Sequence, residues 1–317
     1  MIRKRSIAGV ALLAAFGTSG ITAPKMSRYK VLVYALPDGK GHPSSAIAAM
    51  LLPQWAAQRG IVADVARDPS VMTTEKLREY RAVIFASANG DRFNAEQRLA
   101  FEGFVRGGGG VVGSHAALGG KDWPFYKALF GDIKDIGHTT AYAWITPQPD
   151  TIAVNTTPQA YRGPASDRPA EAESASGFSG RPDSWMVSWT PAYLTVENHR
   201  TPIMRSLAPS HFRREEWHAF DKSPRPRVHV LASVDERTYD STGTSMGVDH
   251  PVIWCLNYSG ARVIYSALGH RSATWRNDTA FREHIMNAIT TAAGEGRFDC
   301  KPGNRPPPQN PLFEIKG

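Results

Sequence analysis

Apolar runs alternate with helical repeats along the first third of the chain. Three runs are predicted to be strands: residues 30–36, 61–66 and 82–87. The first has the β-branched, apolar composition of a strand that is buried on both faces of a parallel sheet. Between the first two runs, apolar residues at helical spacing from Ser44 onward predict a helix that ends at Gly60. Pro53 interrupts this repeat, so the helix is expected to kink or break there.

A second helix is predicted from its capping residues. Asn94 precedes an apolar helical repeat, and Gln97 stands three positions later, which is the spacing of a capping box. The glycines of residues 107–110 end this helix, and residues 111–112 begin a fourth strand that leads into the turn at residues 113–117. Strands that alternate with helices in this way predict an α/β fold, with a doubly wound, mostly parallel sheet and helices on both faces.

The second half of the chain has a different pattern. Residues 147–184 are rich in Pro, Ala, Ser, Thr and Gly. This composition indicates a long insertion, either beside an active site or as a partly mobile loop, and not a separate domain. Strand-like runs return at four places: residues 193–197, 228–234, 251–256 and 262–268. The last two flank a turn with Gly260 and predict an added hairpin, and a final helix is expected from about Asp278.

The two ends of the chain are expected to lie outside the folded domain. Residues 3–5 (RKR) precede an apolar stretch and a region of small residues, so residues 1–23 resemble a signal peptide, with a buried N-terminal helix as the alternative. The apolar stretch is too short to span a bilayer, so the mature protein should have no integral membrane segment. The sequence predicts an exported protein, periplasmic or secreted, with one domain over residues 29–293 and a proline-rich tail over residues 294–317.

Charge and cysteine content narrow the possible partners. The net charge is +8, and without residues 3–5 it is about +5, spread over the chain with no long run of Lys or Arg. A nucleic-acid-binding face would need clustered basic residues interleaved with aromatic ones, so nucleic acid is not expected as a partner. The two cysteines, Cys255 and Cys300, could pair in an oxidising compartment, but Cys255 lies in an apolar strand-like run and could equally be a buried free thiol.

Two histidines follow predicted parallel strands, at the sheet edge where open α/β sheets bind ligands. His42 comes after the first strand, and His115 lies in the turn Gly113-x-His115-x-Ala117 after the fourth. The small flanking residues permit a sharp, strained turn with the layout of a nucleophile elbow, which exposes its central residue. Imidazole at that position suits a general acid or base or a metal ligand, and the alternative is a histidine that caps the next helix.

Residues 107–117 (GGGGVVGSHAA) and 249–270 (DHPVIWCLNYSGARVIYSALGH) resemble the two signatures of the ThuA-like family, named for trehalose utilisation. Weaker similarities are His42, His138 after Phe130-Gly131, and the run Glu215-Glu216-Trp217. The resemblance covers about residues 29–293 and implies a fold like that of class I glutamine amidotransferases.

The same resemblance implies a role in carbohydrate metabolism, on disaccharides or on oxidised (keto) sugars. The elbow cysteine of the amidotransferases corresponds to His115, so glutamine hydrolysis is not expected. The chain departs from the family in its long insertion and in carrying His218 after Trp217, where an aromatic residue is expected. Both departures leave the identity of the sugar open.

The expected catalytic residues are His115, His42, Glu216 and His270. The three histidines follow strand ends and Glu216 is the best acidic candidate, so their side chains are expected to converge. Such a set suits zinc or another divalent cation, for which His42, His115 and His270 are candidate ligands, and no other cofactor is indicated.

Five further residues are candidates for binding a small-molecule carbohydrate: Trp123, Trp217, Arg262, Ser114 and His138. Tryptophan faces suit the apolar faces of sugar rings, although most tryptophans belong to cores. The leading hypothesis is a sugar-processing enzyme (a hydrolase, lyase or isomerase), and the sequence does not indicate an oligomeric state. The alternatives are a non-catalytic carbohydrate-binding protein on the same fold and a serine hydrolase that uses Ser114.

Overall fold

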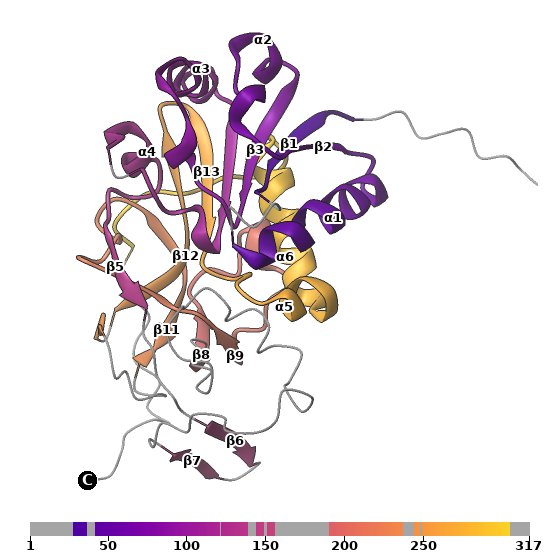
Figure 1. Ribbon diagram of the computed structural model, residues 1–317. Helices are drawn as coiled ribbons and strands as arrows, with labels where there is room; N and C mark the ends of the chain where they lie inside the picture. Colours follow the sequence, from indigo (N-terminus) through magenta and orange to yellow (C-terminus); the bar gives the residue numbers. More distant parts are fainter. Residues whose placement is uncertain are drawn as a thin grey trace, which may run out of the picture.

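A nine-stranded mixed sheet forms the centre of the computed structural model (Figure 1). The structure describes residues 28–36, 42–120, 122–138, 144–148, 151–155, 190–236, 244–247 and 249–304. The strands of the large sheet are β1 (Lys30–Tyr34), β2 (Val62–Ala66), β3 (Tyr80–Ala86), β4 (Gly110–Ser114), β8 (Thr190–Val196), β9 (Ser210–Glu215), β11 (His229–Asp235), β12 (His250–Tyr258) and β13 (Ala261–Ser266). Their order across the sheet is β2-β1-β3-β4-β13-β12-β11-β8-β9.

The first five strands of this order pair in parallel, and the others are antiparallel extensions. Strand β1 lies between β2 and β3, as the doubly wound pattern predicts. The α/β class is therefore confirmed. The predicted hairpin is β12 and β13, which joins the parallel part to an antiparallel part that also contains β11, β8 and β9.

Helices cover both faces of the sheet (Figure 1). On one side lie α1 (Pro43–Gln58), α5 (Ser272–Asn277) and α6 (Thr279–Ala292), and on the other lie α2 (Thr74–Leu77), α3 (Ala95–Arg106) and α4 (Pro124–Leu129). The expected break at Pro53 is wrong, because α1 continues through it. The neighbouring Leu52 and Trp55 are buried, so packing against the core holds the helix despite the missing backbone donor.

The predicted helix starts agree with the structure. Asn94 accepts the N–H of Gln97 at 2.9 Å, and the side chain of Gln97 accepts the N–H of Asn94 at 2.9 Å, which completes the capping box of α3. At α6, Asp278 accepts the N–H of Phe281 at 2.8 Å. The starts of both helices therefore follow from short-range signals in the sequence.

The described residues also form two small, two-stranded sheets. Strand β5 (Asp135–His138) pairs with β10 (His218–Phe220), and β6 (Trp144–Gln148) pairs with β7 (Thr151–Asn155). Most of the predicted insertion at residues 147–184, the proposed signal peptide at residues 1–23 and the end of the tail lie outside the described residues.

The two cysteines, whose pairing the sequence leaves open, form a disulfide. Cys255, in β12, pairs with Cys300, with their Cα atoms 5.6 Å apart. The bond ties the described part of the C-terminal tail to the sheet, where the N–H of Val230 also donates to Asn304 Oδ1 at 2.8 Å. Among the described residues, no helix has the length and hydropathy that a bilayer crossing requires.

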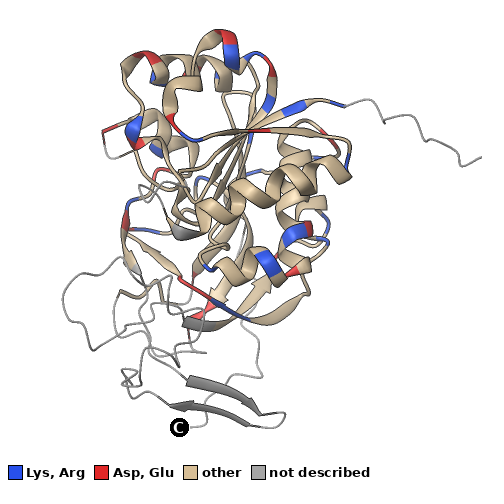
Figure 2. Ribbon diagram, turned by 45° about the vertical axis from the view of Figure 1, so that its right-hand side comes forward, with Lys and Arg blue, Asp and Glu red and all other residues tan. Residues whose placement is uncertain are grey.

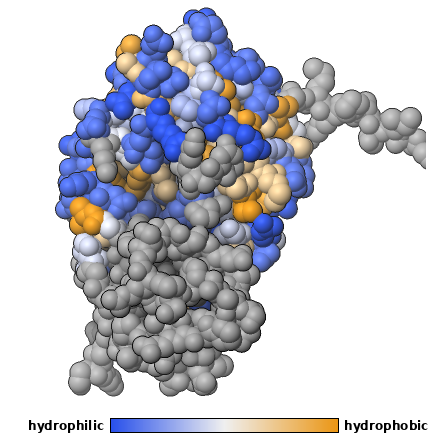
Figure 3. Space-filling view, viewed as in Figure 1, coloured by the Kyte–Doolittle hydropathy of each residue, from blue (hydrophilic) through white to orange (hydrophobic). Residues whose placement is uncertain are grey.

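The described surface mixes charges of both signs. Figure 2 shows acidic and basic residues interspersed over the helices and loops of that view. Figure 3 shows apolar residues as separate spots among hydrophilic ones on the face it presents. The exposed large hydrophobic residues within the described ranges come from different elements: Met50, Val62, Leu99 and Ile136.

Candidate functional site

The turn at His115 has the strained backbone that its sequence predicts. His115 follows β4 and begins the short helix η3 (His115–Ala117), with a φ of 45° in the left-handed region. A Cβ at Gly113 would lie 2.8 Å from the Phe130 ring and 2.9 Å from the Ala117 Cβ, so only glycine fits there. The hydroxyl of Tyr265 donates to the carbonyl of His115 at 2.8 Å. The elbow is therefore held in place from both sides.

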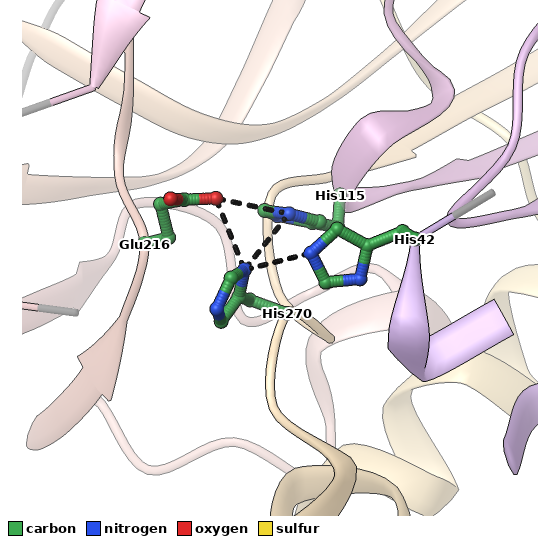
Figure 4. Close-up of side chains that lie close together, drawn as sticks. All are labelled: His42, His115, Glu216 and His270. Atoms are coloured by element: carbon green, nitrogen blue, oxygen red, sulfur yellow. Dashed lines mark hydrogen bonds and ion pairs between the residues drawn. The ribbon is translucent and has the colours of Figure 1, made fainter. Parts of the chain in front are cut away.

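Four side chains from distant segments converge at this edge of the sheet (Figure 4). They are His42 at the start of α1, His115 after β4, Glu216 between β9 and β10, and His270 after β13. One ligand atom from each lies within 4.8 Å of all the others. This set, called here the His–Glu centre, consists of the four residues that the sequence predicts as catalytic.

The distances within the His–Glu centre are close to those of a metal site. His270 Nδ1 lies 3.0 Å from His42 Nε2, 3.2 Å from His115 Nε2 and 3.0 Å from Glu216 Oε2. His115 Nε2 lies 3.3 Å from Glu216 Oε2. Ligand atoms around a tetrahedral cation with bonds of about 2.0–2.1 Å lie about 3.3 Å apart. Imidazole nitrogens and a carboxylate are also the donors that zinc accepts, so the residues fit a divalent cation.

The electrostatics of the His–Glu centre favour a cation. Burial lowers the pKa of His115 well below its usual value, so its imidazole is neutral. Burial raises the pKa of Glu216, but the hydrogen bonds from His115 and His270 outweigh this effect and hold the pKa below its usual value. An ionised carboxylate beside a neutral imidazole is the protonation state in which Glu216 and His115 would bind a metal.

His42 and His270 are held by polar partners outside the centre. His42 Nδ1 lies 2.8 Å from Ser44 Oγ, which donates to Ser87 Oγ at 2.8 Å. Near His270, the indole N–H of Trp275 donates to the carbonyl of Gly269 at 2.9 Å, where a φ of 108° requires glycine.

Glu215 also supports His270, although it is not among the site residues predicted from the sequence. It is buried and accepts the N–H of His270 at 3.2 Å and the hydroxyl of Thr274 at 3.0 Å. Burial raises its pKa. The only sequence feature that pointed to Glu215 was its position next to Glu216, and Glu216 is a member of the His–Glu centre.

Two more residues near the centre were missed as functional candidates. His218 Nε2 lies 3.3 Å from His115 Nδ1, and His218 Nδ1 lies 2.7 Å from Asp135 Oδ2. In the sequence, His218 stands out only as a departure from the family, and Asp135 is not among the predicted residues. Asp135 also lines a cavity of about 550 Å³ together with Asn89, Asp91, Gly119, Lys127 and Lys134.

Three of the residues predicted to bind substrate are buried or hydrogen bonded within the protein instead. Trp123 is buried, and its indole N–H donates to Glu102 Oε1 at 2.8 Å, so little of the ring is open to a ligand. Trp217 is completely buried. Arg262 is the second residue of β13, at the end of the strand remote from His270, and donates to the carbonyls of Thr291, Glu295 and Gly296 near the end of α6. These contacts occupy side chains that were expected to face a sugar.

The other two candidates belong to the structure around the elbow. Ser114 is buried, and its hydroxyl accepts the N–H of Ser87 at 3.2 Å. A nucleophile needs an accessible hydroxyl beside a base, so this environment speaks against the serine hydrolase alternative. His138 lies in β5, where its backbone is in register with His218.

A family model described as ThuA, trehalose utilisation, matches residues 30–292. The chain belongs to the ThuA family. Its fold is similar to that of a ThuA-like protein from Bacteroides uniformis, with a TM-score of 0.58 and 22% identity over 85% of this chain and 93% of that one. A ThuA-like protein from Parabacteroides merdae has a TM-score of 0.54 and 17% identity over 84% and 90%. No curated protein matches the sequence.

The family assignment confirms the resemblance on which the expected fold and role rest. The two ThuA-like structures share the α/β fold of this chain. A GMP synthase protein from Thermoplasma acidophilum superposes less closely, with a TM-score of 0.42 and 9% identity over 84% of this chain and 94% of that one. Membership of a family named for trehalose utilisation supports a carbohydrate-related role.

Proposed function

We propose that this ThuA-family protein is an exported enzyme that processes disaccharides or oxidised (keto) sugars at the His–Glu centre, with a divalent cation such as zinc. The observation that carries the proposal is the convergence of His42, His115, Glu216 and His270 within 4.8 Å. A divalent cation bound among these four groups would balance the charge of the carboxylate and use the lone pairs of the imidazoles.

Each residue of the centre has a role in this proposal. His42, His115 and His270 supply imidazole nitrogens, and Glu216 supplies the negative charge. A bound divalent cation would supply Lewis-acid polarisation of a sugar carbonyl or hydroxyl. Glu216 would also orient a sugar hydroxyl by accepting a hydrogen bond from it, and His115 is positioned by the strained elbow on which it stands.

The disulfide supports the proposed export. Disulfides persist in the periplasm and outside the cell and are rare in reducing compartments. Cys255 and Cys300 are the only cysteines of the chain, and they are paired. The basic and apolar pattern of residues 1–23 is consistent with the same location.

The proposal is tested first by elemental analysis of the purified mature protein, with one equivalent of a divalent metal expected. A screen against disaccharides and their keto derivatives then identifies the substrate. The His115→Ala variant should lose the metal and the turnover, whereas the His199→Ala variant, changed in an exposed histidine, should keep both. Full turnover by His115→Ala on the substrate found in the screen would refute the proposal.

The carbohydrate-binding alternative predicts a different result from the same variants. In that case calorimetry would show sugar binding that is unaffected by His115→Ala, and no product would form. The serine hydrolase alternative predicts that a fluorophosphonate probe labels Ser114, and we expect no labelling because this hydroxyl is buried.

A further inference from the structure

The cavity of about 550 Å³ beside Asp135 lies at the same edge of the sheet as the His–Glu centre. Its wall includes Asn89, which follows β3, and Leu118 and Gly119, which follow β4 through η3. The side chain of Asn89 donates to the carbonyl of Leu118 at 3.3 Å and so joins these two loops. Open α/β sheets bind ligands beyond the carboxyl ends of their strands, and small-molecule sites commonly have volumes of about 300–1,000 Å³. The cavity therefore has the position and size of a ligand site.

The charged residues that line the cavity are two of each sign. Lys127 and Lys134 carry ammonium groups, and Asp91 and Asp135 carry carboxylates. Within the described part of the chain, neither lysine forms an ion pair. Asp91 accepts the N–H of Gly120 with one oxygen, which leaves the other oxygen as an acceptor. The wall thus offers both donors and acceptors, and its four charges sum to zero.

This lining suits a neutral sugar. A sugar hydroxyl both donates and accepts hydrogen bonds, as a wall with both kinds of group requires. An anion would meet the two carboxylates as well as the two ammonium groups, so the four charges together would give it little net attraction. Leu118 and Ile133 also line the cavity and are only partly buried, so the C–H face of a sugar ring can pack against them.

One side chain separates the cavity from the His–Glu centre. Nδ1 of His218 lies 2.7 Å from Oδ2 of Asp135 in the cavity wall, and Nε2 of His218 lies 3.3 Å from Nδ1 of His115 in the centre. None of the four residues of the centre belongs to the cavity wall as the described residues form it. A ligand that occupies both sites must therefore extend past the ring of His218.

We propose that the cavity is a subsite for a neutral sugar unit, namely the unit of the substrate that does not lie at the cation. The proposal rests on the proposed function and narrows it, because the substrate must then be a saccharide of at least two units. Lys127, in α4, and Lys134 donate to the hydroxyls of this unit. Lys127 contributes more, because it is partly buried and its ammonium group is less screened by water than that of the exposed Lys134.

Chemical modification of lysines shows where a sugar binds. The purified protein is treated with an acetylating reagent in the presence and absence of trehalose, maltose or cellobiose, and mass spectrometry of peptides follows each lysine. We expect at least one of these neutral disaccharides to slow the acetylation of Lys127 and Lys134. Lys76, which pairs with Glu79 outside the cavity, should react at an unchanged rate. Glucuronate, as an anionic probe, should protect none of the three lysines.

Substitution of Lys127 tests the contribution of its charge. Lys127→Met removes the ammonium group but keeps an unbranched side chain, and it should weaken binding of the protecting disaccharide about 10-fold in calorimetry, as expected for one hydrogen bond to a charged group. Lys127→Arg keeps a charged donor and should retain most of the affinity, and the matched control Lys76→Met should bind like the wild type. With the substrate found in the screen, Lys127→Met should raise KM about 10-fold at an unchanged kcat, because the unit in the cavity does not react.

Three results would overturn the proposal: none of the disaccharides protects Lys127 and Lys134, glucuronate alone protects them, or Lys127→Met binds the protecting disaccharide as tightly as Lys76→Met does. A disaccharide held only at the His–Glu centre would give the last result and would lose its affinity in His115→Ala. Failure of the proposed function has a different signature. In that case the lysines are protected, but the protein binds no divalent metal and turns over no sugar.

Discussion

Nε2 of His42 lies 3.0 Å from Nδ1 of His270, although 228 positions separate the two residues in the sequence. His42 follows β1 and His270 follows β13, and both strands end at the same edge of the sheet. The contact therefore exists only in the folded chain, and it joins the first strand of the domain to the last. We therefore expect the two histidines to bind the same ligand, so that changing one of them alters the contribution of the other.

A double-mutant cycle on His42 and His270 tests this dependence. His42→Ala and His270→Ala should each weaken zinc binding more than about 100-fold, because even residues that only support metal ligands are worth about 10- to 100-fold. The double variant should lose much less than the sum of the two free-energy changes, since the site is already broken by either change. Chelator competition measures the affinities. Small, additive losses would contradict a shared ligand.

Gly113 should be essential for the shape of the elbow. A Cβ there would overlap the Phe130 ring and the Ala117 Cβ, so Gly113→Ala should lower the free energy of unfolding by about 1–3 kcal/mol. It should also weaken zinc binding, because His115 is two residues away. The matched control is Gly103→Ala, in a helix where a Cβ meets nothing within 4 Å. That change should stabilise the protein by about 0.5–1 kcal/mol. Equal unfolding midpoints for the two variants in urea would contradict this explanation.

The convergence of the three histidines was predictable, because ligand sites in open α/β sheets lie at the carboxyl ends of the strands. Parallel strands present their carboxyl ends at one edge, so His42, His115 and His270 could be placed together from strand patterns alone. The strain at His115 was also readable, because small residues surround it in the sequence. Glu216 was found through its acidic and aromatic context and the family resemblance.

The surroundings of the centre could not be predicted in the same way. Asp135 and His218 meet through β5 and β10, whose short strands are too brief to show a period and lie about 80 positions apart. The environments of the tryptophans could not be predicted for a different reason. An aromatic residue near a turn has the same pattern whether it packs in the core, as Trp123 and Trp217 do, or faces a ligand.

The disulfide should contribute to stability through the C-terminal segment. Cys255 and Cys300 close a loop with a sequence separation of 45, for which the chain-entropy model gives about 4 kcal/mol. Reduction should therefore lower the free energy of unfolding by about 2–4 kcal/mol, measured by denaturant titration with and without dithiothreitol. A Cys255→Ala, Cys300→Ala double variant should not respond to the reductant. Titration of the unfolded, unreduced protein should find no free thiol, and two reactive thiols would contradict the pairing.

His284 should make the protein less stable as the pH falls. Its ring is completely buried between the carbonyl of Ile203, at 3.0 Å from Nδ1, and Ser266 Oγ, at 3.1 Å from Nε2. Burial lowers its pKa from 6.5 to about 4, an effect that the hydrogen bond to Ile203 only partly offsets. Between these two values the unfolded chain binds a proton that the folded chain does not. The free energy of unfolding contributed by His284 is therefore complete above pH 6.5 and falls by about 3 kcal/mol as the pH drops to about 4.

The His284→Gln variant isolates this effect. Glutamine can still hydrogen bond to Ile203 and Ser266 but does not titrate, and the other buried histidines are present in both proteins. The variant should be less stable than the wild type at pH 7, because its side chain packs less well in a site shaped for a ring. The difference should shrink as the pH is lowered, since only the wild type loses the contribution of His284. Urea unfolding between pH 4.5 and 7.5 gives both curves, and parallel curves over this range would show that His284 is protonated at the same pH in the folded and unfolded chains.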